Sequence, residues 1–450
     1  MKRFSNLAAL LGTMLLAGTA FAQQADQPVL KGEAAFGDWR QDRPGVRRLI
    51  GPQDLQKPNQ AQSSSNSADK VRMPEGAKPL LPPGFSAQLI ASDLRGPRVV
   101  RVAPNGDLFV ADSRANRILS YRLGEGGAGQ VREEVFAKGL HQPYGIAFYP
   151  ADKPQWVYVA NSNSVVRFAY RDGDLKASKA PQTVISRVPS NHHWTRDIAF
   201  SPDGKTLYLS VGSGSNVAEG IGKAPEGGLA RWTASAALGA AWGSEKGRAQ
   251  VRAYDPDGQN EHVVATGLRN CSGMTVQPET GSLWCVVNER DGLGDNVPFE
   301  YATTVKNGAF YGWPWTYIGD HEDPRHAGER PDLTGKVTLP DVLMQAHSAP
   351  LNIAFYEGDN FPAEYRGDAF VTLHGSWNRG KRTGYKVVRL LFEDGRPTGE
   401  YEDFMTGFVV SDAEVWGRPV GVAVARGGSL IVTEDGSGTI WRVVHDAGKP

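Results

Sequence analysis

The sequence predicts an all-β protein, a six-bladed β-propeller that follows a polar N-terminal extension. Glycine is abundant, and the apolar runs are rich in Val, Ile, Phe, Tyr and Trp, which are residues that favour strands. Asn-Gly and Asp-Gly turns separate several of these runs, as is typical of β-hairpins. One hairpin phrase also occurs six times, and a repeat of this kind predicts blades in a radial array.

Residues 1–22 have the features of a secretory signal peptide. Lys2 and Arg3 form a charged start, residues 7–20 are an apolar run too short for a membrane-spanning helix, and Ala20-Phe21-Ala22 fits the small-x-small cleavage rule. No later segment is apolar enough to span a bilayer. We therefore expect a periplasmic or secreted protein with no membrane insertion.

Residues 23–82 are polar and punctuated by prolines, and we predict that they form an extension rather than a domain. Residues 60–70 are of low complexity. Phe36-Gly-Asp-Trp39 and Arg47-Arg-Leu-Ile50 carry enough bulk to dock on a folded body. The propeller, as the catalytic domain, is expected to span residues 83–446.

The repeated phrase is a strand, a tight turn and a second strand. Its first copy is Arg95-Gly-Pro-Arg-Val-Val-Arg-Val-Ala-Pro-Asn-Gly-Asp-Leu-Phe-Val-Ala-Asp112. A single blade cannot bury both of its faces, so blades pack around an axis and leave only short edges. The alternative, a pair of β-sandwiches, would not explain the recurring first strand. The other copies begin at His141, Thr195, Arg269, Ala349 and Arg418.

Polar residues precede the first strand of most copies. Because the innermost strand of each blade lines the central channel, these residues are expected to converge on one rim of the propeller. This convergence is the main indication of a functional site. The residues are His141, Gln142, His192, His193, Arg196, Arg269, Asn270, His347, Ser348, Trp416 and Arg418.

The adjacent His192 and His193 offer a general base beside the cation of Arg196. A histidine near an arginine keeps a low pKa and can accept a proton at neutral pH. Any single loop histidine is more often a structural hydrogen-bonder, but two adjacent ones at a predicted rim favour the catalytic interpretation.

Four arginines would bind a polyanion together if they share this rim. A guanidinium holds a carboxylate or phosphate through two hydrogen bonds, so the set indicates a ligand with more than one such group. No Gly-x-Gly-x-x-Gly leads from a strand into a helix and no Walker loop is present, which argues against a nicotinamide or nucleotide cofactor. The four are Arg269, Arg290, Arg379 and Arg418.

The loop Glu289-Arg-Asp-Gly-Leu-Gly-Asp295 combines carboxylates with glycine carbonyls, which are the oxygen ligands that calcium uses. It lacks the spacing of an EF-hand, and a turn without metal is an equal alternative.

Cys271 and Cys285 are the only cysteines, and either a disulfide or two buried thiols fits the sequence. No motif indicates zinc, a serine hydrolase or haem. Lysine plus arginine equal aspartate plus glutamate at 49 each, so no charge excess points to nucleic acid.

Eight phrases spread over the chain form a specific set. They are Pro82-Pro-Gly-Phe85, Arg101-Val-Ala-Pro-Asn-Gly106, His193-Trp-Thr-Arg196, Gly267-Leu-Arg-Asn270, Asn288-Glu-Arg-Asp-Gly-Leu-Gly-Asp295, Tyr311-Gly-Trp-Pro314, His347-Ser-Ala-Pro350 and His374-Gly-Ser-Trp-Asn-Arg379. Together they resemble the soluble quinoprotein sugar dehydrogenases of the L-sorbosone dehydrogenase type, relatives of the soluble glucose and aldose sugar dehydrogenases. The resemblance covers nearly all of the chain after the predicted signal peptide.

This resemblance implies a six-bladed propeller that binds pyrroloquinoline quinone (PQQ) and calcium on its top face and oxidises an aldose or a sugar aldehyde. It implies that His193 is the general base, with His192 as the competing choice, and that Arg269 contacts the reacting oxygen. His347 stands where the family has a small hydroxyl residue, and Arg379 lies near the family's cofactor-binding lysine. The expected cofactor contacts are Arg269, Asn270, Arg290, His347, Arg379 and Arg418, the expected calcium ligands are the carbonyls of Asp291 and Gly292, and His141 and Gln142 are expected at the substrate.

Two other functions stay open at this point. A calcium-dependent hydrolase of the lactonase kind would use rim carboxylates and a calcium-bound water, and it would need no quinone. A non-catalytic propeller would bind a glycan or a protein partner and would not respond to the quinone. No motif identifies the sugar, the electron acceptor or the oligomeric state.

Overall fold

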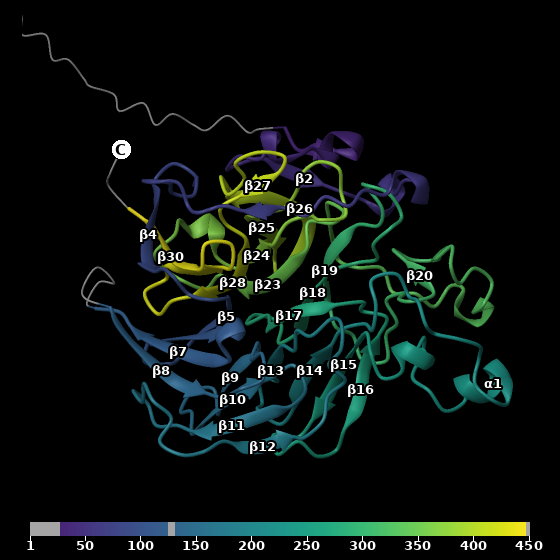
Figure 1. Cartoon of the computed structure of the whole chain (residues 1–450), viewed down its shortest axis with the longest axis horizontal. Helices are drawn as coiled ribbons and strands as arrows, with labels where there is room; N and C mark the ends of the chain where they lie inside the picture. Colours follow the sequence, from purple (N-terminus) through teal and green to yellow (C-terminus); the bar gives the residue numbers. More distant parts are fainter. Residues whose placement is uncertain (1–27, 125–130, 447–450) are drawn as a thin grey trace, which may run out of the picture.

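Six β-sheets arranged around one axis form the body of the protein (Figure 1). The computed structural model describes residues 28–124 and 131–446. Five of these sheets have four strands and the other has six, and within the described ranges the only α-helix is α1 (Gly228–Thr233). The predicted all-β, six-bladed propeller is therefore confirmed, whereas the predicted signal peptide at residues 1–22 lies outside the described residues.

Each blade is an antiparallel meander that leads from the axis toward the outside of the disc. The strands of blades 1 to 3 are β5 (Pro97–Val102), β6 (Leu108–Asp112), β7 (Arg117–Arg122) and β8 (Arg132–Lys138); β9 (Ile146–Tyr149), β10 (Trp156–Ala160), β11 (Val165–Ala169) and β12 (Gln182–Ile185); β13 (Ile198–Phe200), β14 (Leu207–Val211), β15 (Gln250–Tyr254) and β16 (His262–Thr266). Those of blades 4 to 6 are β17 (Cys271–Val276), β18 (Leu283–Val287), β19 (Glu300–Thr304) and β22 (Val342–Met344); β23 (Pro350–Phe355), β24 (Ala369–Leu373), β25 (Lys386–Glu393) and β26 (Arg396–Met405); β28 (Pro419–Val424), β29 (Leu430–Glu434), β30 (Thr439–His445) and β4 (Phe85–Ala91). Short 3-10 helices lie at Gly32–Phe36, Trp39–Gln41, Pro52–Asp54, Gln60–Gln62, Ser113–Ala115, Gly243–Glu245, Pro331–Leu333 and Ala363–Tyr365.

The innermost strands form a closed ring. β5 contacts β9 and β28, and the ring continues through β13, β17 and β23. β4, which precedes the first blade in the chain, pairs with β30 and so completes the last blade. All five residues of β6 are buried, because a strand in the middle of a blade packs against blades on both sides. Closure in this way joins the two ends of the propeller without an open edge between them.

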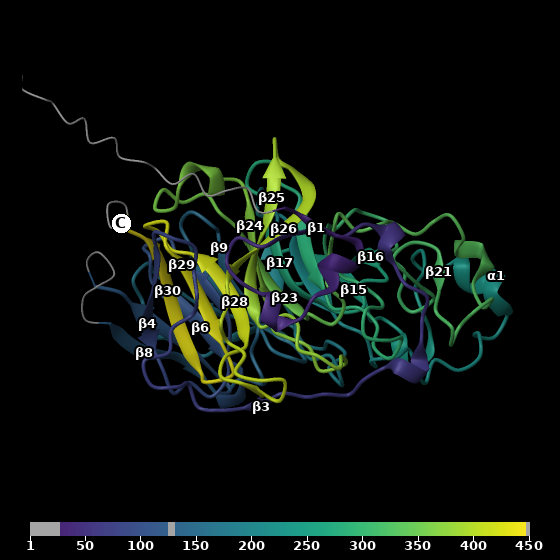
Figure 2. The same ribbon diagram turned by 90° about the horizontal axis from the view of Figure 1, so that it is seen from above.

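The extension adds strands to the propeller. β1 (Leu30–Lys31) and β2 (Arg47–Leu49) continue blade 5 beyond β26, which is why this sheet has six strands. β3 (Asp69–Lys70) pairs in parallel with β27 (Glu414–Val415). Figure 2 shows the purple-to-blue chain before β4 running across the molecule from the side of β21 and α1 to the side of β4 and β30.

Buried ion pairs fasten this extension to blade 5. Arg48 is fully buried and lies 2.7 Å from Asp403 and 2.9 Å from Asp42. Lys386 reaches the same two carboxylates, each at 2.7 Å. Breaking one partner of such a network would leave an uncompensated buried charge, so the register of β2 on β26 is firmly set.

Two long insertions form a lobe beside blades 3 and 4. One joins β14 to β15 and contains α1, and the other joins β19 to β22 and contains β20 (Thr316–Tyr317) and β21 (His321–Glu322). Trp242, Trp313 and Trp315 are buried in the core that the two insertions share. α1 and β20 project from one side of the disc in Figure 1.

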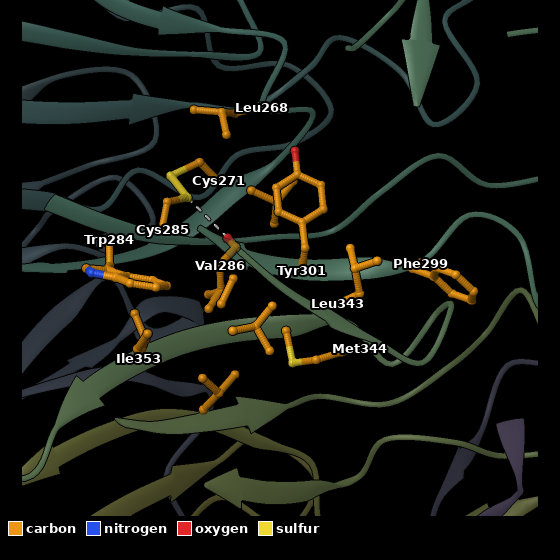
Figure 3. Close-up of a cluster of buried hydrophobic side chains, with 14 of the residues drawn as sticks. Leu268, Cys271, Trp284, Cys285, Val286, Phe299, Tyr301, Leu343, Met344 and Ile353 are labelled. Carbon is orange, nitrogen blue, oxygen red and sulfur yellow. Dashed lines mark hydrogen bonds between the residues drawn. A yellow bond between two sulfur atoms is a disulfide. The ribbon is translucent and has the colours of Figure 1, made fainter. Parts of the chain in front are cut away.

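The core of blade 4 holds the two cysteines (Figure 3). Cys271 and Cys285 lie on the neighbouring strands β17 and β18, and the structure joins them in a disulfide. Trp284 and Tyr301 are buried close by, in a cluster of apolar side chains from blade 4 and blade 5. The disulfide is therefore the alternative that the structure adopts.

No described helix has the length and apolar character to cross a membrane.

Candidate active site

Loops from several blades meet at the end of the propeller where the innermost strands begin. Each second strand runs antiparallel to the innermost strand, so the loop that follows it returns to this same end. Arg269, before β17, lies 2.6 Å from Asp291, after β18, measured between Nη2 and Oδ2. His193, before β13, contacts Ser213, after β14. The two ends of the hairpin at residues 267–295 thus belong to one site.

His193 is held with one ring nitrogen turned inward. Its Nδ1 lies 2.8 Å from Ser213 Oγ and 3.2 Å from the Ser213 carbonyl oxygen. The Ser213 hydroxyl donates to the Ser215 carbonyl at 2.8 Å, so its oxygen is left to accept. Nδ1 therefore carries the proton and Nε2 has the lone pair. Burial, together with the positive charge of Arg269, lowers the pKa of His193 well below its usual range.

A buried arginine side chain holds the loop that carries His193 through hydrogen bonds to its carbonyl groups. The fully buried Arg196 donates to the His193 carbonyl at 2.7 Å and to the Pro189 carbonyl, so it positions the loop rather than facing the rim. Gly212 lies against the site from the next strand. A Cβ at Gly212 would stand 2.8 Å from His193 Cβ and closer still to Asn270 Oδ1, so only glycine leaves both side chains their places.

Arg269 is fixed by acceptors at both of its terminal nitrogens. Besides Asp291, its Nη2 donates to the side-chain and carbonyl oxygens of Asn216 at 3.0 Å, and its Nη1 donates to the Asn288 carbonyl at 3.2 Å. The guanidinium carbon lies 5.4 Å from the centre of the Trp313 ring. Burial opposes ionisation of Asp291, but Arg269 and His347 together outweigh burial and lower the pKa of that carboxyl. Arg269 is thus a buried cation with a fixed direction.

His192 and Asn270 complete this side of the site. His192 Nε2 lies 2.9 Å from Asn216 Oδ1, an acceptor, so this nitrogen carries the proton. Asn270 Nδ2 donates to Asn288 Oδ1 at 3.0 Å. The two candidate bases therefore differ: His193 keeps Nε2 free to accept a proton, whereas His192 commits its Nε2–H to Asn216.

Arg290 and His347 both brace the loop after β18. Arg290 pairs with the buried Asp323 through Nε at 2.6 Å and Nη2 at 3.2 Å, and its Nη1 donates to the Asp291 carbonyl. His347 Nε2 donates to the Gly294 carbonyl at 3.0 Å, and its Nδ1 lies 3.6 Å from Asp291 Oδ1. Burial opposes its protonation, but Asp291, Glu300 and the Gly294 carbonyl together raise the pKa of His347. Both side chains are thus engaged within the protein.

A second arginine cluster lies on the side of blades 5 and 6. Arg418 Nη2 donates to His374 Nδ1 at 2.8 Å, and His374 Nε2 donates to Asp435 Oδ1 at 2.8 Å. Burial and the charge of Arg418 lower the pKa of His374 to about 3, so the ring is neutral. Arg98 pairs with the other oxygen of Asp435 at 2.7 Å and lies 5.5 Å from the centre of the Trp194 ring. Because Trp194 follows His193 in the chain, this contact links the two clusters.

Three other predicted residues contact neither cluster within the described part of the chain. Arg379 is buried and donates to the Phe36 carbonyl at 2.5 Å, so it faces the extension. His141 and Gln142 are exposed before β9, and His141 Nδ1 lies 2.6 Å from Ser162 Oγ. Their expected roles at cofactor and substrate stay predictions.

The extension supports two of the site loops from outside. Asn59 N donates to the Leu293 carbonyl at 2.7 Å, in the loop after β18. Asn378, in the loop after β24, accepts from Gly292 N at 2.7 Å and donates to Ser63 Oγ at 3.2 Å. The extension thus ties together the loops that follow the second strands of blades 4 and 5.

Several residues of the site follow second strands and were not predicted from the sequence as site residues. They share one signal: an antiparallel hairpin brings the residue after its second strand back beside the residue before its first. That rule, applied to every copy, would have found most of them. The residues are Ser213, Asn216, Asn288, His374 and Asp435.

Comparison with known proteins assigns the chain to a class. A family model described as TrAA12-like matches residues 79–308 and 329–446, and the chain belongs to this family. A PQQ-dependent sugar dehydrogenase of Hypocrea jecorina is 25% identical over 425 residues, covering 82% of this chain and 90% of that protein. A PQQ-dependent pyranose dehydrogenase of Coprinopsis cinerea is 23% identical over 426 residues, covering 81% of this chain but 54% of that protein, so the chain spans about half its length.

Solved structures show the same fold. The holo PQQ domain of the Coprinopsis cinerea pyranose dehydrogenase superposes with a TM-score of 0.67 at 21% identity, covering 83% of this chain and 98% of that domain. A calcium structure of a Trichoderma reesei family AA12 enzyme gives the same TM-score at 21% identity, covering 84% and 99%. The family match leaves out residues 309–328 and the extension before residue 79, so Asp323 and Ser63 belong to parts of the chain outside it.

Proposed function

We propose that the protein is a PQQ-dependent dehydrogenase that oxidises an aldose, or a sugar aldehyde of the L-sorbosone kind, at this face of the propeller. The observation that carries the proposal is a neutral His193 with an unprotonated Nε2 in the electrostatic field of Arg269. The names of the Hypocrea jecorina and Coprinopsis cinerea relatives support PQQ as cofactor and a sugar as substrate.

The residues present fit a polyanionic quinone. Arg269 Nε and Arg418 Nε are buried donors that have no hydrogen-bond partner within the described part of the chain. Buried donors without acceptors are costly, and PQQ, a tricarboxylate, would supply acceptors. We propose that Arg418 and Arg269 hold the cofactor carboxylates or carbonyls with Asn270, while Arg290, His347 and Arg379 act by positioning the surrounding loops.

The two residues predicted to bind calcium, Asp291 and Gly292, differ in the contacts of their oxygens. Asp291 Oδ2 accepts from Arg269 and the Asp291 carbonyl accepts from Arg290, so arginines contact two of the three Asp291 oxygens that could bind a cation. Of the two predicted ligands, Gly292 alone keeps a carbonyl that no described donor uses.

The chemistry of this chain is then a proton transfer coupled to a hydride transfer. PQQ, when bound, supplies the acceptor of the hydride. His193 Nε2 takes the proton from a sugar hydroxyl, or from the hydrate of an aldehyde, while the C–H bond releases a hydride, which is a two-electron oxidation. Arg269 stabilises the negative charge that develops on the substrate oxygen, since a fixed buried cation reorganises little. The exposed His141 and Gln142 are proposed to contact the sugar from the rim.

The deciding experiment is reconstitution of the purified protein. We expect PQQ to change its absorption spectrum on binding and the reconstituted protein to reduce an electron-acceptor dye only when an aldose or sugar aldehyde is present. Titration with calcium and with a chelator then shows whether the ion is needed. Absence of any spectral change with PQQ would overturn the proposal. A lactonase would instead hydrolyse its substrate without the quinone, and a binding propeller would reduce no dye.

A further inference from the structure

An arginine-lined pocket opens at the same end of the propeller, on the outer side of the loop that carries His193. It has a volume of about 530 Å³, and it is lined by residues 187–191 together with Arg248 and Arg252. Arg187 follows β12 and Arg248 precedes β15, the outer strands of blades 2 and 3. The lining residues do not include the histidines or arginines proposed for catalysis, so this pocket is separate from the active site.

The pocket gathers more positive than negative charge. Arg252 pairs with Glu261 at 2.8 Å, and the Glu261 side chain is 53% exposed. Arg187 is exposed and makes no ion pair with any carboxylate in residues 28–124 and 131–446. Arg248 is buried, and its donors go to uncharged acceptors, the Gly212 and Ser213 carbonyls at 3.3 and 3.4 Å.

A further buried cation, Arg196, lies close to the residues that line the pocket. Arg196 donates only to carbonyl oxygens of its own loop, and its Nε has no hydrogen-bond partner among the described residues. Burial and the neighbouring charges of Arg248 and Arg252 lower its pKa to about 9. Glu245, whose charge acts on Arg248, already accepts from Gly214 N at 2.9 Å. Like charges gathered in a partly buried place repel one another, and a bound anion would relieve that repulsion.

We propose that this pocket binds a small free oxyanion, held through phosphate or carboxylate oxygens by Arg187, Arg248 and Arg252. Guanidinium groups are the side chains best suited to such oxygens, since each can donate two parallel hydrogen bonds. The three come from two blades, so one anion would bridge the segment after β12 to the start of β15.

The position of the pocket couples it to the catalytic loop. Arg248 contacts the Ser213 carbonyl, which is also an acceptor for His193 Nδ1. Asn191, two residues before His193 in the chain, lines the pocket, and its side-chain oxygen accepts a hydrogen bond from Arg248. An anion that orders Arg248 would therefore also fix the positions of Ser213 and Asn191, which hold the loop and the ring of His193. The pocket would act as an effector site rather than as part of the reacting centre.

The test is calorimetric titration of the full chain with inorganic phosphate at constant ionic strength, with chloride as the balancing anion. We expect saturable binding to one site. Arg187→Ala should weaken it by about tenfold, the effect of one charge-assisted contact. Glu261→Gln should tighten it several-fold, because it removes the one carboxylate that competes for Arg252. Arg426→Ala is the matched control, since Arg426 is an exposed arginine in the turn between β28 and β29, outside the pocket lining, and should leave binding unchanged.

No saturable binding, or equal affinity in the wild type and in Arg187→Ala, would overturn the proposal. Because both substitutions are at exposed positions, loss of the fold does not confuse the result. The measurement needs neither quinone nor sugar, so it gives its answer even if the proposed dehydrogenase activity is absent.

Discussion

On the side of blades 3 and 4, Arg269 is enclosed by a carboxylate, an amide and two carbonyls, and its charge acts on a neighbouring neutral histidine. On the side of blades 5 and 6, Arg418 donates to a neutral His374, and its nearest carboxylate, Asp435, stands 3.9 Å away and is shared with Arg98. The first arginine is therefore hydrogen-bonded to a carboxylate, whereas the second has a neutral histidine as its side-chain partner and no carboxylate of the described residues within hydrogen-bond distance.

This difference separates two tasks within one face of the propeller. A fixed cation beside a base suits charge stabilisation during the reaction, because it reorganises little. A cation held by a neutral partner suits the capture of an anionic group, because it has no strong internal competitor. We therefore expect a change at His193 to act mainly on turnover and a change at Arg418 to act mainly on cofactor affinity.

The largest effect is expected for His193→Ala. Loss of the proton acceptor should lower kcat by about 10²–10⁴-fold, the usual contribution of a general base, while PQQ affinity changes little. Steady-state kinetics on the reconstituted protein measures the loss of kcat, and a PQQ titration measures the cofactor affinity. His192→Ala is the control and should cost much less. If His192→Ala abolished turnover and His193→Ala did not, the assignment of the base would be reversed.

Arg418→Ala should act on the other side of the comparison. We expect PQQ affinity to fall by about 10–100-fold, as for a lost charge-assisted hydrogen bond, with kcat at saturating PQQ largely kept. Arg418→Lys should restore part of the affinity, because the charge returns without the planar fork. The measurement is PQQ binding followed by absorbance. A loss of kcat without a loss of affinity would contradict the division of tasks.

The pH dependence of kcat/KM tests the link between Arg269 and His193. The base must be neutral, and its pKa is lowered well below the ordinary value of 6.5, so activity should persist below pH 6.5 and disappear only as the pH falls through the lowered pKa. Arg269→Gln removes one of the causes of that shift, so the acid limb of the profile should move to higher pH. An unmoved limb in this variant would show that Arg269 does not act on the base.

The smallest effect is expected for Gly212→Ala, which tests the packing on the first side alone. The added methyl group would be too close to His193 and Asn270 and would displace both side chains. We therefore expect kcat to fall about tenfold, as for a small misplacement of the reacting groups, while PQQ affinity is unchanged. Gly427→Ala is the matched control, since a Cβ there meets nothing within 4 Å. Equal activity of the two variants would mean that Gly212 is not needed for the site.

Some features of the site could be predicted from the chain alone. The repeat set the direction of each innermost strand, so it placed His193 and Arg269 at one end of the propeller. The hairpin between residues 267 and 295 also had to return to that end, and the 2.6 Å contact between Arg269 and Asp291 confirms it. The pairing of Cys271 with Cys285 was open, because sequence spacing does not give the distance between two Cα atoms.

What the sequence determined by itself was the architecture, because strand alternation, turn chemistry and the recurring phrase are local and repeat along the chain. Only the tertiary structure decided which partner each arginine takes. Arg290 turns to Asp323 in an insertion and Arg379 to Phe36 in the extension, whereas Arg418 meets His374 of the neighbouring blade. These partners are distant in sequence, and they come together only when the ring closes and the extension packs across the loops, so no local pattern could have specified them.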